Sequence, residues 1–477
     1  MSPFRCATMA SLLFGYTVNS ADAQHLLLDQ PFRAAGLILE MPVPDSMPTA
    51  HMLAPAAHLK FLAAGPVSIV SDALSDTADD RNIPGESLPE LLAMARKLNP
   101  EIAAAVLDAR GAEAAAAAAG ALEDPQFTIS LEDTGRTSTG FPKRVGTAFY
   151  ELDQRLPWWG KRGLQRAVAR AEVDRSKASS QVVTLELETR VKQAFVDAWL
   201  AAEAIAINEE NLRDLRSIAD LTTERYRLGL ARQNEVSEAE IGASEALAEE
   251  LRLNAVLAGA KARLNGLLDR EPDAPLKNPT SLPAVPAEDR LSLDYLLERA
   301  MAGSPVLAER RAALAGARDN RRLTEKQWYP DFTVGFSVVD GFSRDGEEDG
   351  YEARFGINLP LQWGVRRARI SEASAQLGAA DDRVRSAERE LQANLAASLS
   401  ALDAAQRRAE LLAHSHLAQA TAALGSIEAA YPLGRATLGE LLEAHRRLRD
   451  IHLEHLKEEA EQRRLLAEIE MMIGGDL

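Results

Sequence analysis

The feature that most constrains this chain is an internal duplication, in which one pattern returns after 205 residues. The segments Tyr226–Ala231 and Tyr431–Ala436 share Tyr, Leu, Gly and Ala at matching positions. Further matches at this displacement extend from Leu91 to Leu268 of the first copy. Chance similarity does not keep one displacement over such a length, so we predict two copies of one structural unit.

The displacement changes by two residues near Pro157 and Pro360, as an insertion or deletion in a loop would cause. Proline-rich stretches separate the repeats from the rest of the chain. We expect a signal peptide over residues 1–23, a poorly ordered N-terminal extension over 24–85, a first repeat over 86–275, a linker over 276–290 and a second repeat over 291–477.

The expected signal peptide has a basic start at Arg5, a short apolar stretch over Ala10–Val18, and a small-residue cleavage site over Ala21–Ala23. Cleavage there would remove Cys6, the single cysteine of the chain. A disulfide framework and a cysteine-based metal site are therefore excluded.

Each repeat is predicted to contain a helix, two strands and two long helices. After Pro125, the apolar residues Phe127, Ile129 and Leu131 alternate with polar ones, and the second copy alternates in the same way over Phe332–Val338. A period of two is typical of a strand with one apolar face. Segments of about nine or ten residues match the length of a strand in a transmembrane barrel.

Two long helical runs follow the strands, from about Gly160 to Leu228 and from about Gly364 to Ala430, without an internal proline. Apolar residues recur three and four positions apart, for example between Leu391 and Leu402. Such spacing indicates a coiled-coil seam. We expect return helices to begin near Glu235 and Glu440.

Four strands are too few to close a barrel, and an open sheet edge cannot lie in lipid because its backbone groups would lack hydrogen-bond partners. No apolar run is long enough for a transmembrane helix. Three chains would supply twelve strands, within the known range of barrels. We therefore predict a mostly α-helical chain with four membrane strands, which complete a 12-stranded β-barrel in a homotrimer.

Charge and motifs exclude several function classes. The formal net charge of −17 and the lack of a Lys/Arg run argue against a nucleic-acid partner. Paired histidines such as His452 and His455 lack a third ligand, so we predict no metal site. No catalytic motif is found, so we expect neither an enzyme nor a cofactor.

Aromatic residues gather where strands meet helices, as in the belts at membrane interfaces. The candidates are Trp158, Trp159, Trp328, Tyr329 and Trp363. The alternative is that they are ordinary core aromatics. The cations Lys161, Arg162, Arg366 and Arg367 follow directly; they either reach lipid headgroups or are solvated.

The duplicated unit and the paired turns over Tyr226–Ala231 and Tyr431–Ala436 resemble the TolC-type outer-membrane efflux family. The stretch Leu156–Arg162 looks like the heavy-metal branch of that family, which serves copper/silver or cobalt/zinc/cadmium resistance. The resemblance implies a homotrimer in outer-membrane lipid, with a long α-helical barrel in the periplasm. It also implies a periplasmic adaptor and a proton-driven (RND-type) inner-membrane pump as partners.

The resemblance further implies that the two turns form the periplasmic tip where the adaptor docks; a plain helix hairpin is the alternative. The docking candidates are Tyr226, Leu228, Gly229, Leu230, Tyr431, Leu433, Gly434 and Arg435. Rings of carboxylates near such a tip would favour cations in a narrow pore. The pore or gate candidates are Asp220, Glu235, Glu238, Glu440 and Glu443, with Glu224 and Glu428 nearby.

We therefore predict a channel that passively conducts heavy-metal cations out of the cell. Two alternatives stay open: an exit duct of the same kind for drugs or secreted polypeptides, and a periplasmic coiled-coil scaffold or adaptor.

Overall fold

The computed structural model describes residues 83–132, 147–341 and 350–477. The expected signal peptide and almost all of the expected N-terminal extension lie outside these residues, as do the loops between the paired strands. None of the helices in the described ranges is both long and apolar enough to cross a membrane.

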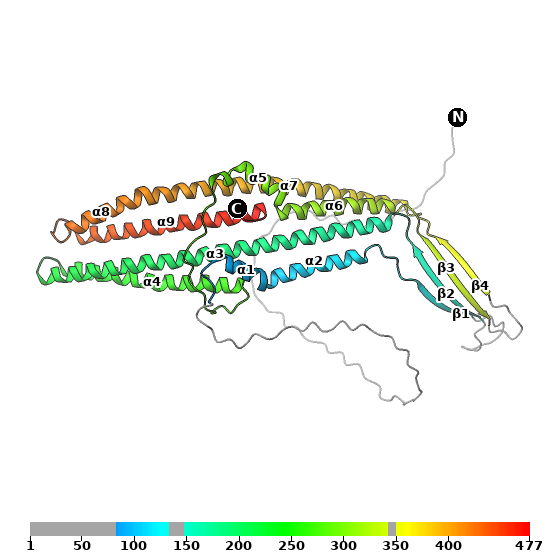
Figure 1. The fold of residues 1–477 in the computed structure, drawn as a ribbon, viewed down its shortest axis with the longest axis horizontal. Coiled ribbons are helices and arrows are strands. Elements are labelled where there is room, and N and C mark those ends of the chain that lie inside the picture. The colour runs from blue at the N-terminus through cyan, green and yellow to red at the C-terminus, as the bar shows by residue number, and fades with distance from the viewer. Residues whose placement is uncertain (1–82, 133–146, 342–349) are drawn as a thin grey trace, which may run out of the picture. The chain divides into compact units, whose positions relative to one another are not determined.

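Both halves have two helices, then two strands, then two long helical arms, and two short turns are added in the second half (Figure 1). The first half contains α1 (Leu88–Leu98), α2 (Pro100–Ala118), β1 (Gln126–Glu132), β2 (Thr147–Leu156), α3 (Lys161–Arg227) and α4 (Gln233–Leu267). The second half contains the 3₁₀ turn η2 (Glu288–Leu291), α5 (Leu293–Gly303), α6 (Pro305–Lys326), β3 (Phe332–Gly341), β4 (Gly350–Ile357), α7 (Trp363–Leu411), the π-helical turn η3 (Leu412–His416), α8 (Leu417–Ala430) and α9 (Leu438–Ile473).

A proline splits the first helical region of each half. Proline disfavours a helical conformation at the preceding residue and fits the first position of a new helix. Accordingly Asn99 and Ser304 are extended, and Pro100 and Pro305 begin α2 and α6. Asn99 also caps α2, because its side-chain oxygen accepts from the Glu101 amide at 2.8 Å.

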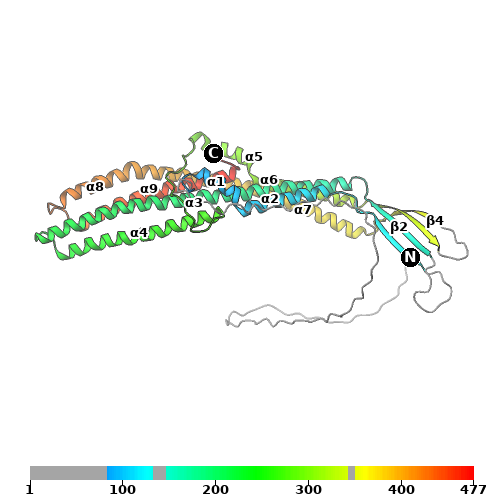
Figure 2. The ribbon, with the colours of Figure 1, turned by 60° about the horizontal axis from the view of Figure 1, so that its bottom comes forward.

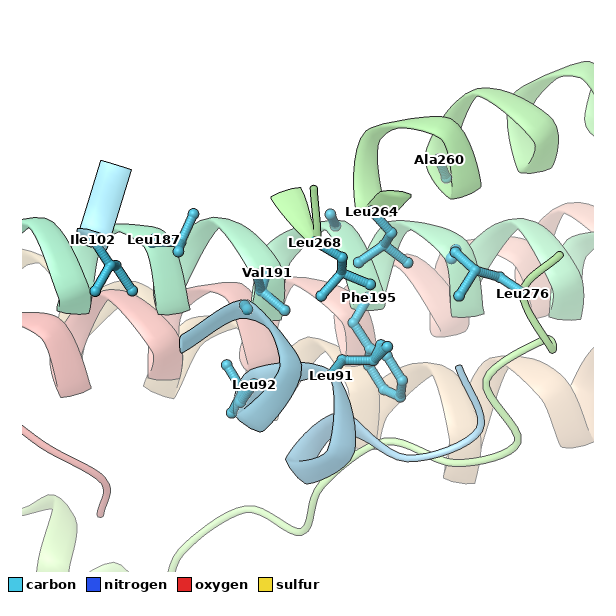
Figure 3. Close-up of a cluster of buried hydrophobic side chains, with 13 residues drawn as sticks. Leu91, Leu92, Ile102, Leu187, Val191, Phe195, Ala260, Leu264, Leu268 and Leu276 are labelled. Carbon is cyan, nitrogen blue, oxygen red and sulfur yellow. The ribbon is translucent and has the colours of Figure 1, made fainter. Parts of the chain in front are cut away.

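The long helix α3 packs against α2, α4, α6 and α9. Its apolar residues Leu187, Val191 and Phe195 recur every four positions and are buried. Together with Leu91 of α1 and Leu264 of α4, they form a hydrophobic cluster (Figure 3). The hairpins α3–α4 and α8–α9 run side by side and end at the same side of the molecule (Figures 1 and 2).

The four strands form one antiparallel sheet in the order β1-β2-β3-β4. Ile129 is opposite Tyr150, Tyr150 is opposite Val338, and Val338 is opposite Tyr351. Directly opposite residues share a face, so the alternation predicted from the sequence gives one continuous apolar face. The following large apolar side chains of that face are exposed: Phe127, Ile129, Leu131, Tyr150, Leu152, Val334, Phe336, Val338, Tyr351, Phe355 and Ile357.

The long helix of the second half is not uniform, although the sequence predicted one uninterrupted run. Before the π-helical turn, buried positions match the first half at a displacement of 204, as with Val191 and Leu395. After it, Tyr226 and Tyr431 match at 205. A π-helical turn takes up one more residue than an α-helical turn. The turn η3 therefore accounts for the change in displacement from 204 to 205.

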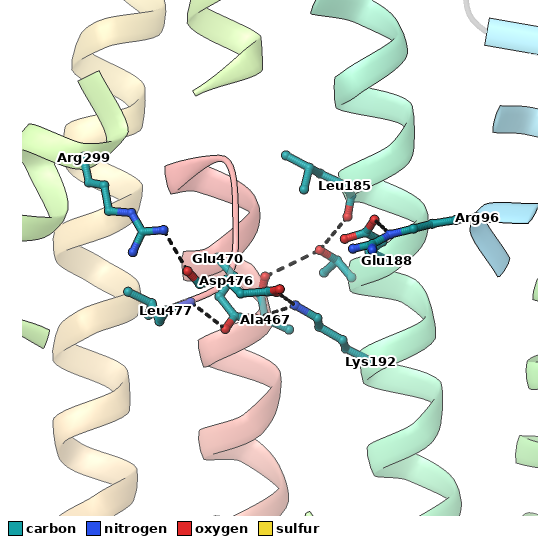
Figure 4. A network of polar contacts seen from close by, with 10 residues as sticks. Arg96, Leu185, Glu188, Lys192, Arg299, Ala467, Glu470, Asp476 and Leu477 are labelled. Carbon is teal, nitrogen blue, oxygen red and sulfur yellow. Dashed lines mark hydrogen bonds and ion pairs between the residues drawn. The ribbon is translucent and has the colours of Figure 1, made fainter. Parts of the chain in front are cut away.

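A polar network holds the end of α9 against α3 and α5 (Figure 4). Lys192 of α3 bonds to Glu470 at 2.6 Å and to Asp476 at 2.8 Å, and Arg299 of α5 donates to the Asp476 carbonyl. Burial works to lower the pKa of Lys192, but its two carboxylate partners outweigh burial and raise it. In turn, the bond from Lys192 lowers the pKa of the Asp476 carboxyl. The network therefore links three helices by charged groups.

Candidate functional site

The first tip turn, Tyr226–Ala231, ends α3 in a Schellman motif. The amide of Gly229 donates to the Tyr226 carbonyl at 2.9 Å, and the amide of Leu230 donates to the Arg225 carbonyl at 2.8 Å. Gly229 has a φ of 72°, a value that side chains with a Cβ disfavour. The glycine therefore allows the chain to reverse into α4.

The second tip turn, Tyr431–Ala436, has the same backbone. Gly434 has a φ of 69° and donates to the Tyr431 carbonyl at 3.0 Å. The amide of Arg435 donates to the Ala430 carbonyl at 3.1 Å. The repeated sequence thus produces the same motif twice.

The tyrosines of the two turns have different surroundings. Tyr226 is 46% exposed, whereas Tyr431 is 2% exposed and its hydroxyl lies 2.9 Å from the Thr222 hydroxyl of α3. The Arg225 guanidinium lies over the Tyr431 ring, 4.8 Å from its centroid, and donates to the Tyr431 carbonyl at 2.9 Å. The structure therefore brings the end of α3 against the second tip turn.

The helices that leave the two turns also begin differently. Thr437 and Glu440 form a capping box at the start of α9, in which each side chain accepts from the backbone amide of the other. The bond from the Thr437 amide lowers the pKa of the Glu440 carboxyl. In the first half, Arg232 is the N-cap residue of α4 and makes no capping bond.

Apolar side chains project from both turns. Leu228 is 72% exposed, and Leu230, Leu433 and the polar residue Arg435 are also exposed. These residues are therefore available to a partner in the isolated chain.

Besides Glu440, four acidic residues are candidates for the pore or gate. Asp220, Glu238 and Glu443 are exposed, and Glu235 is half-buried. Within the described residues, none of these four forms an ion pair. The nearby Glu224 pairs with Arg227 at 2.7 Å.

The sequence reasoning missed His445, which is buried in α9. Its Nε2 atom lies 3.2 Å from Glu428 of α8, and its Nδ1 atom lies 3.9 Å from Asp214 of α3. A histidine at a position of the apolar seam between Leu441 and Leu448 was the available signal. No group of three or more His, Cys, Asp or Glu side chains suited to a metal occurs in the described part of the chain.

At the strand–helix junction, three predicted belt aromatics pack together. Trp158 stacks on Tyr329 and on Phe332, with ring centroids 5.4 Å apart in each pair, and meets Trp159 edge-on at 4.9 Å. Trp159 is 73% exposed. Trp328 is half-buried, and Trp363, which begins α7, is exposed. At the junction, Trp158 is therefore packed between other aromatic rings, while Trp159 and Trp363 are exposed.

Both expectations for Lys161, that it reaches lipid headgroups or that it is solvated, are wrong. Lys161 is buried, and its ammonium bonds to the Asp331 carboxylate at 2.7 Å and to the Tyr329 carbonyl at 2.8 Å. Burial works to raise the pKa of Asp331, which lies before β3, but the Lys161 and Trp158 contacts outweigh it and lower the pKa. This ion pair joins the start of α3 to the start of β3.

The chain is similar to known outer-membrane proteins. The chain matches the family described as "Outer membrane efflux protein" twice, over residues 91–269 and 296–475. It is 24% identical over 392 residues to the pyoverdine export outer membrane protein OpmQ of Pseudomonas putida, covering 75% of this chain and 76% of OpmQ. It is 22% identical over 377 residues to the cobalt-zinc-cadmium resistance protein CzcC of Cupriavidus metallidurans, covering 78% and 85%.

Among solved structures, the outer membrane protein VceC of Vibrio cholerae has the same fold, with a TM-score of 0.70 and 20% identity. The similarity covers 82% of this chain and 96% of VceC. The predicted fold class and the predicted outer-membrane location are confirmed. Because the family match covers both repeats, the chain belongs to the outer membrane efflux protein family and is not an enzyme.

Proposed function

We propose that three copies of the chain form the outer-membrane duct of a tripartite, proton-driven efflux system that exports heavy-metal cations. The observation that carries the proposal is the sheet, whose apolar face is exposed and whose outer strands are β1 and β4. In lipid, free edges of the outer strands would leave backbone groups without partners. Pairing of β1 with β4 of another copy removes the edges, and three copies give twelve strands.

The two tip turns are the proposed docking site for a periplasmic adaptor. Their leucines are exposed, while their backbones are held by the Schellman motifs. An exposed apolar surface on a rigid backbone suits a protein partner, since little ordering entropy is lost on binding. The exposed carboxylates of Asp220, Glu238 and Glu443 would favour cations near this end.

Heavy metal is the proposed cargo because CzcC is named for cobalt, zinc and cadmium resistance and because Leu156–Arg162 resembles the heavy-metal branch. OpmQ, which is named for pyoverdine export, favours an organic cargo as the second candidate. The family match argues against the scaffold alternative.

The test is a deletion strain, complemented with the intact gene, in which tolerance to cobalt, zinc, cadmium, copper and silver is compared with tolerance to dyes and with siderophore release. Loss of metal tolerance alone supports the metal duct. Loss of dye tolerance or siderophore release with unchanged metal tolerance contradicts it and supports the second candidate.

A variant pair tests the docking site. Leu228→Asp combined with Leu433→Asp should abolish complementation while the protein still reaches the outer membrane as a trimer. Leu251→Asp, at an exposed leucine of α4 several turns away, is the control and should complement. Full complementation by the double variant would exclude the turns as the docking site.

A further inference from the structure

A pocket of about 600 Å³ lies where β2 ends and α3 begins. Its walls are apolar and include Trp159, Phe332, Val334 and Phe355. Val334 is directly opposite Phe355 in the sheet, so both belong to the exposed apolar face. The pocket therefore continues the surface that we assign to lipid, at the end of the strands where the helices begin.

Two arginines of α3, Arg162 and Arg166, also line this pocket. Arg162 donates from Nε to the Gly120 carbonyl at 2.6 Å. Arg166 also lies against Gly120, since a Cβ at that glycine would be 3.1 Å from Arg166 Nε. Both arginine side chains therefore lie against Gly120.

Neither arginine forms an ion pair with a carboxylate in the part of the chain that the structure describes. This differs from Lys161, which is buried against Asp331. Two like charges that lie close together repel each other, and a bound anion would offset that repulsion. A guanidinium offers several N–H donors in a plane, a geometry that suits phosphate oxygens.

We propose that this pocket holds one glycerophospholipid of the periplasmic leaflet. Its phosphate lies between Arg162 and Arg166, and an acyl chain covers Phe332, Val334 and Phe355. The combination of an apolar wall with a cationic rim matches a phosphodiester that carries acyl chains. Free phosphate would leave the apolar wall without a partner. The site rests on the proposed membrane position of the strands.

The second half does not repeat the site. At a displacement of 204, which aligns Trp159 with Trp363, the counterpart of Arg166 is Ile370. The counterpart of Arg162 is Arg366, which likewise bonds to a backbone carbonyl, that of Gln327, so the missing second arginine distinguishes the two halves. One lipid per protomer is therefore expected, on the first-half side of the sheet.

The test uses the full-length protein, reconstituted in phosphatidylethanolamine and phosphatidylglycerol vesicles, extracted in mild detergent and examined by native mass spectrometry. We expect one retained phospholipid per protomer. Arg166→Gln should raise the dissociation constant of this lipid about tenfold, and so lower its retention, since a charge-assisted hydrogen bond of ordinary strength is lost. Arg162→Gln should act in the same direction, and Arg162→Lys should retain more lipid than Arg162→Gln.

Arg170→Gln is the matched control, because Arg170 is an exposed arginine one turn further along α3 that does not line the pocket. Phe355→Ser tests the wall without disturbing a core, because Phe355 is 83% exposed. Equal lipid retention by the Arg166 and Arg170 variants, or no retained lipid in the unmodified protein, would overturn the site. Failure of the proposed channel would appear separately, as loss of trimers or of the outer-membrane fraction for every form of the protein.

Discussion

The first and second tip turns have the same backbone but different surroundings. Both are Schellman motifs with a left-handed glycine, and both place leucines in solvent. Only the second has a buried tyrosine, held by Thr222 and Arg225 of the other half, and a capping box behind it. Local sequence thus determines the path of the chain, whereas contacts between the halves determine how firmly each turn is held.

The largest difference is expected at the tyrosines. Tyr431→Ala should lower the free energy of unfolding by about 3–5 kcal/mol, as for other buried aromatics. Tyr226→Ala should change it by about 0.5 kcal/mol or less, because this ring is half in solvent. Guanidinium unfolding in detergent, followed by circular dichroism at helical wavelengths, measures both. Equal losses would refute the difference between the turns.

The glycines should behave alike. Gly229→Ala and Gly434→Ala should each cost about 1–2 kcal/mol, because a Cβ is strained at positive φ. A Cβ at either position meets no atom within 4 Å, so backbone strain is the only expected cost. Gly425→Ala, in open space within α8, is the control and should not destabilise the protein. A clearly unequal cost for the two tip glycines would show that their surroundings affect the backbone as well.

The caps should be partly exchangeable. Thr437→Ala removes the side chain that accepts from Glu440 and should cost about 1 kcal/mol. Arg232→Thr places a capping residue before Glu235 in the first half and should stabilise the start of α4 by a similar or smaller amount. Amide hydrogen exchange in the first turns of α4 and α9 measures both effects. No slowing of exchange in the Arg232→Thr variant would show that the first tip turn cannot form the box.

The smallest effect is a dependence on pH confined to the second tip turn. The folded state lowers the pKa of Glu440 below its ordinary value of 4.5, through the amide of Thr437. The contribution is therefore complete above pH 4.5 and is lost as the pH falls through the lowered folded value. The protection factors of the amides at the start of α9, which correct the exchange rate for its intrinsic pH dependence, should fall over that range. Glu440→Gln should remove this pH dependence, and an unchanged fall in the protection factors of that variant would contradict the assignment.

The strands and the tip turns could be predicted from local sequence. The alternation from Phe332 to Val338 predicted the apolar face of a strand, and the Gly residues of the repeated segments predicted turns, because period and φ are local properties. The burial of Tyr431 and the exposure of Tyr226 could not be predicted, since their own segments share the Tyr, Leu, Gly and Ala that form the turn. They depend on Thr222 and Arg225, whose counterparts in the second half are Ile427 and Ala430.

The same limit applies to charged groups. Lys161 follows two tryptophans and was expected to be free, but Asp331, 170 positions away in the chain, buries it in an ion pair. His445 was missed because its partners Asp214 and Glu428 come from two other helices. Pairings between distant segments have no periodic signature, and so pattern reasoning does not find them.

The π-helical turn Leu412–His416 has a consequence for how such a chain can evolve. One extra residue inserted into a regular helix rotates everything beyond it by about 100° and would turn Leu424 and Tyr431 out of their core. Confining the surplus to one widened turn leaves the orientation of the later residues intact. A duplicated gene can therefore gain a codon in mid-helix without loss of the contacts made further along.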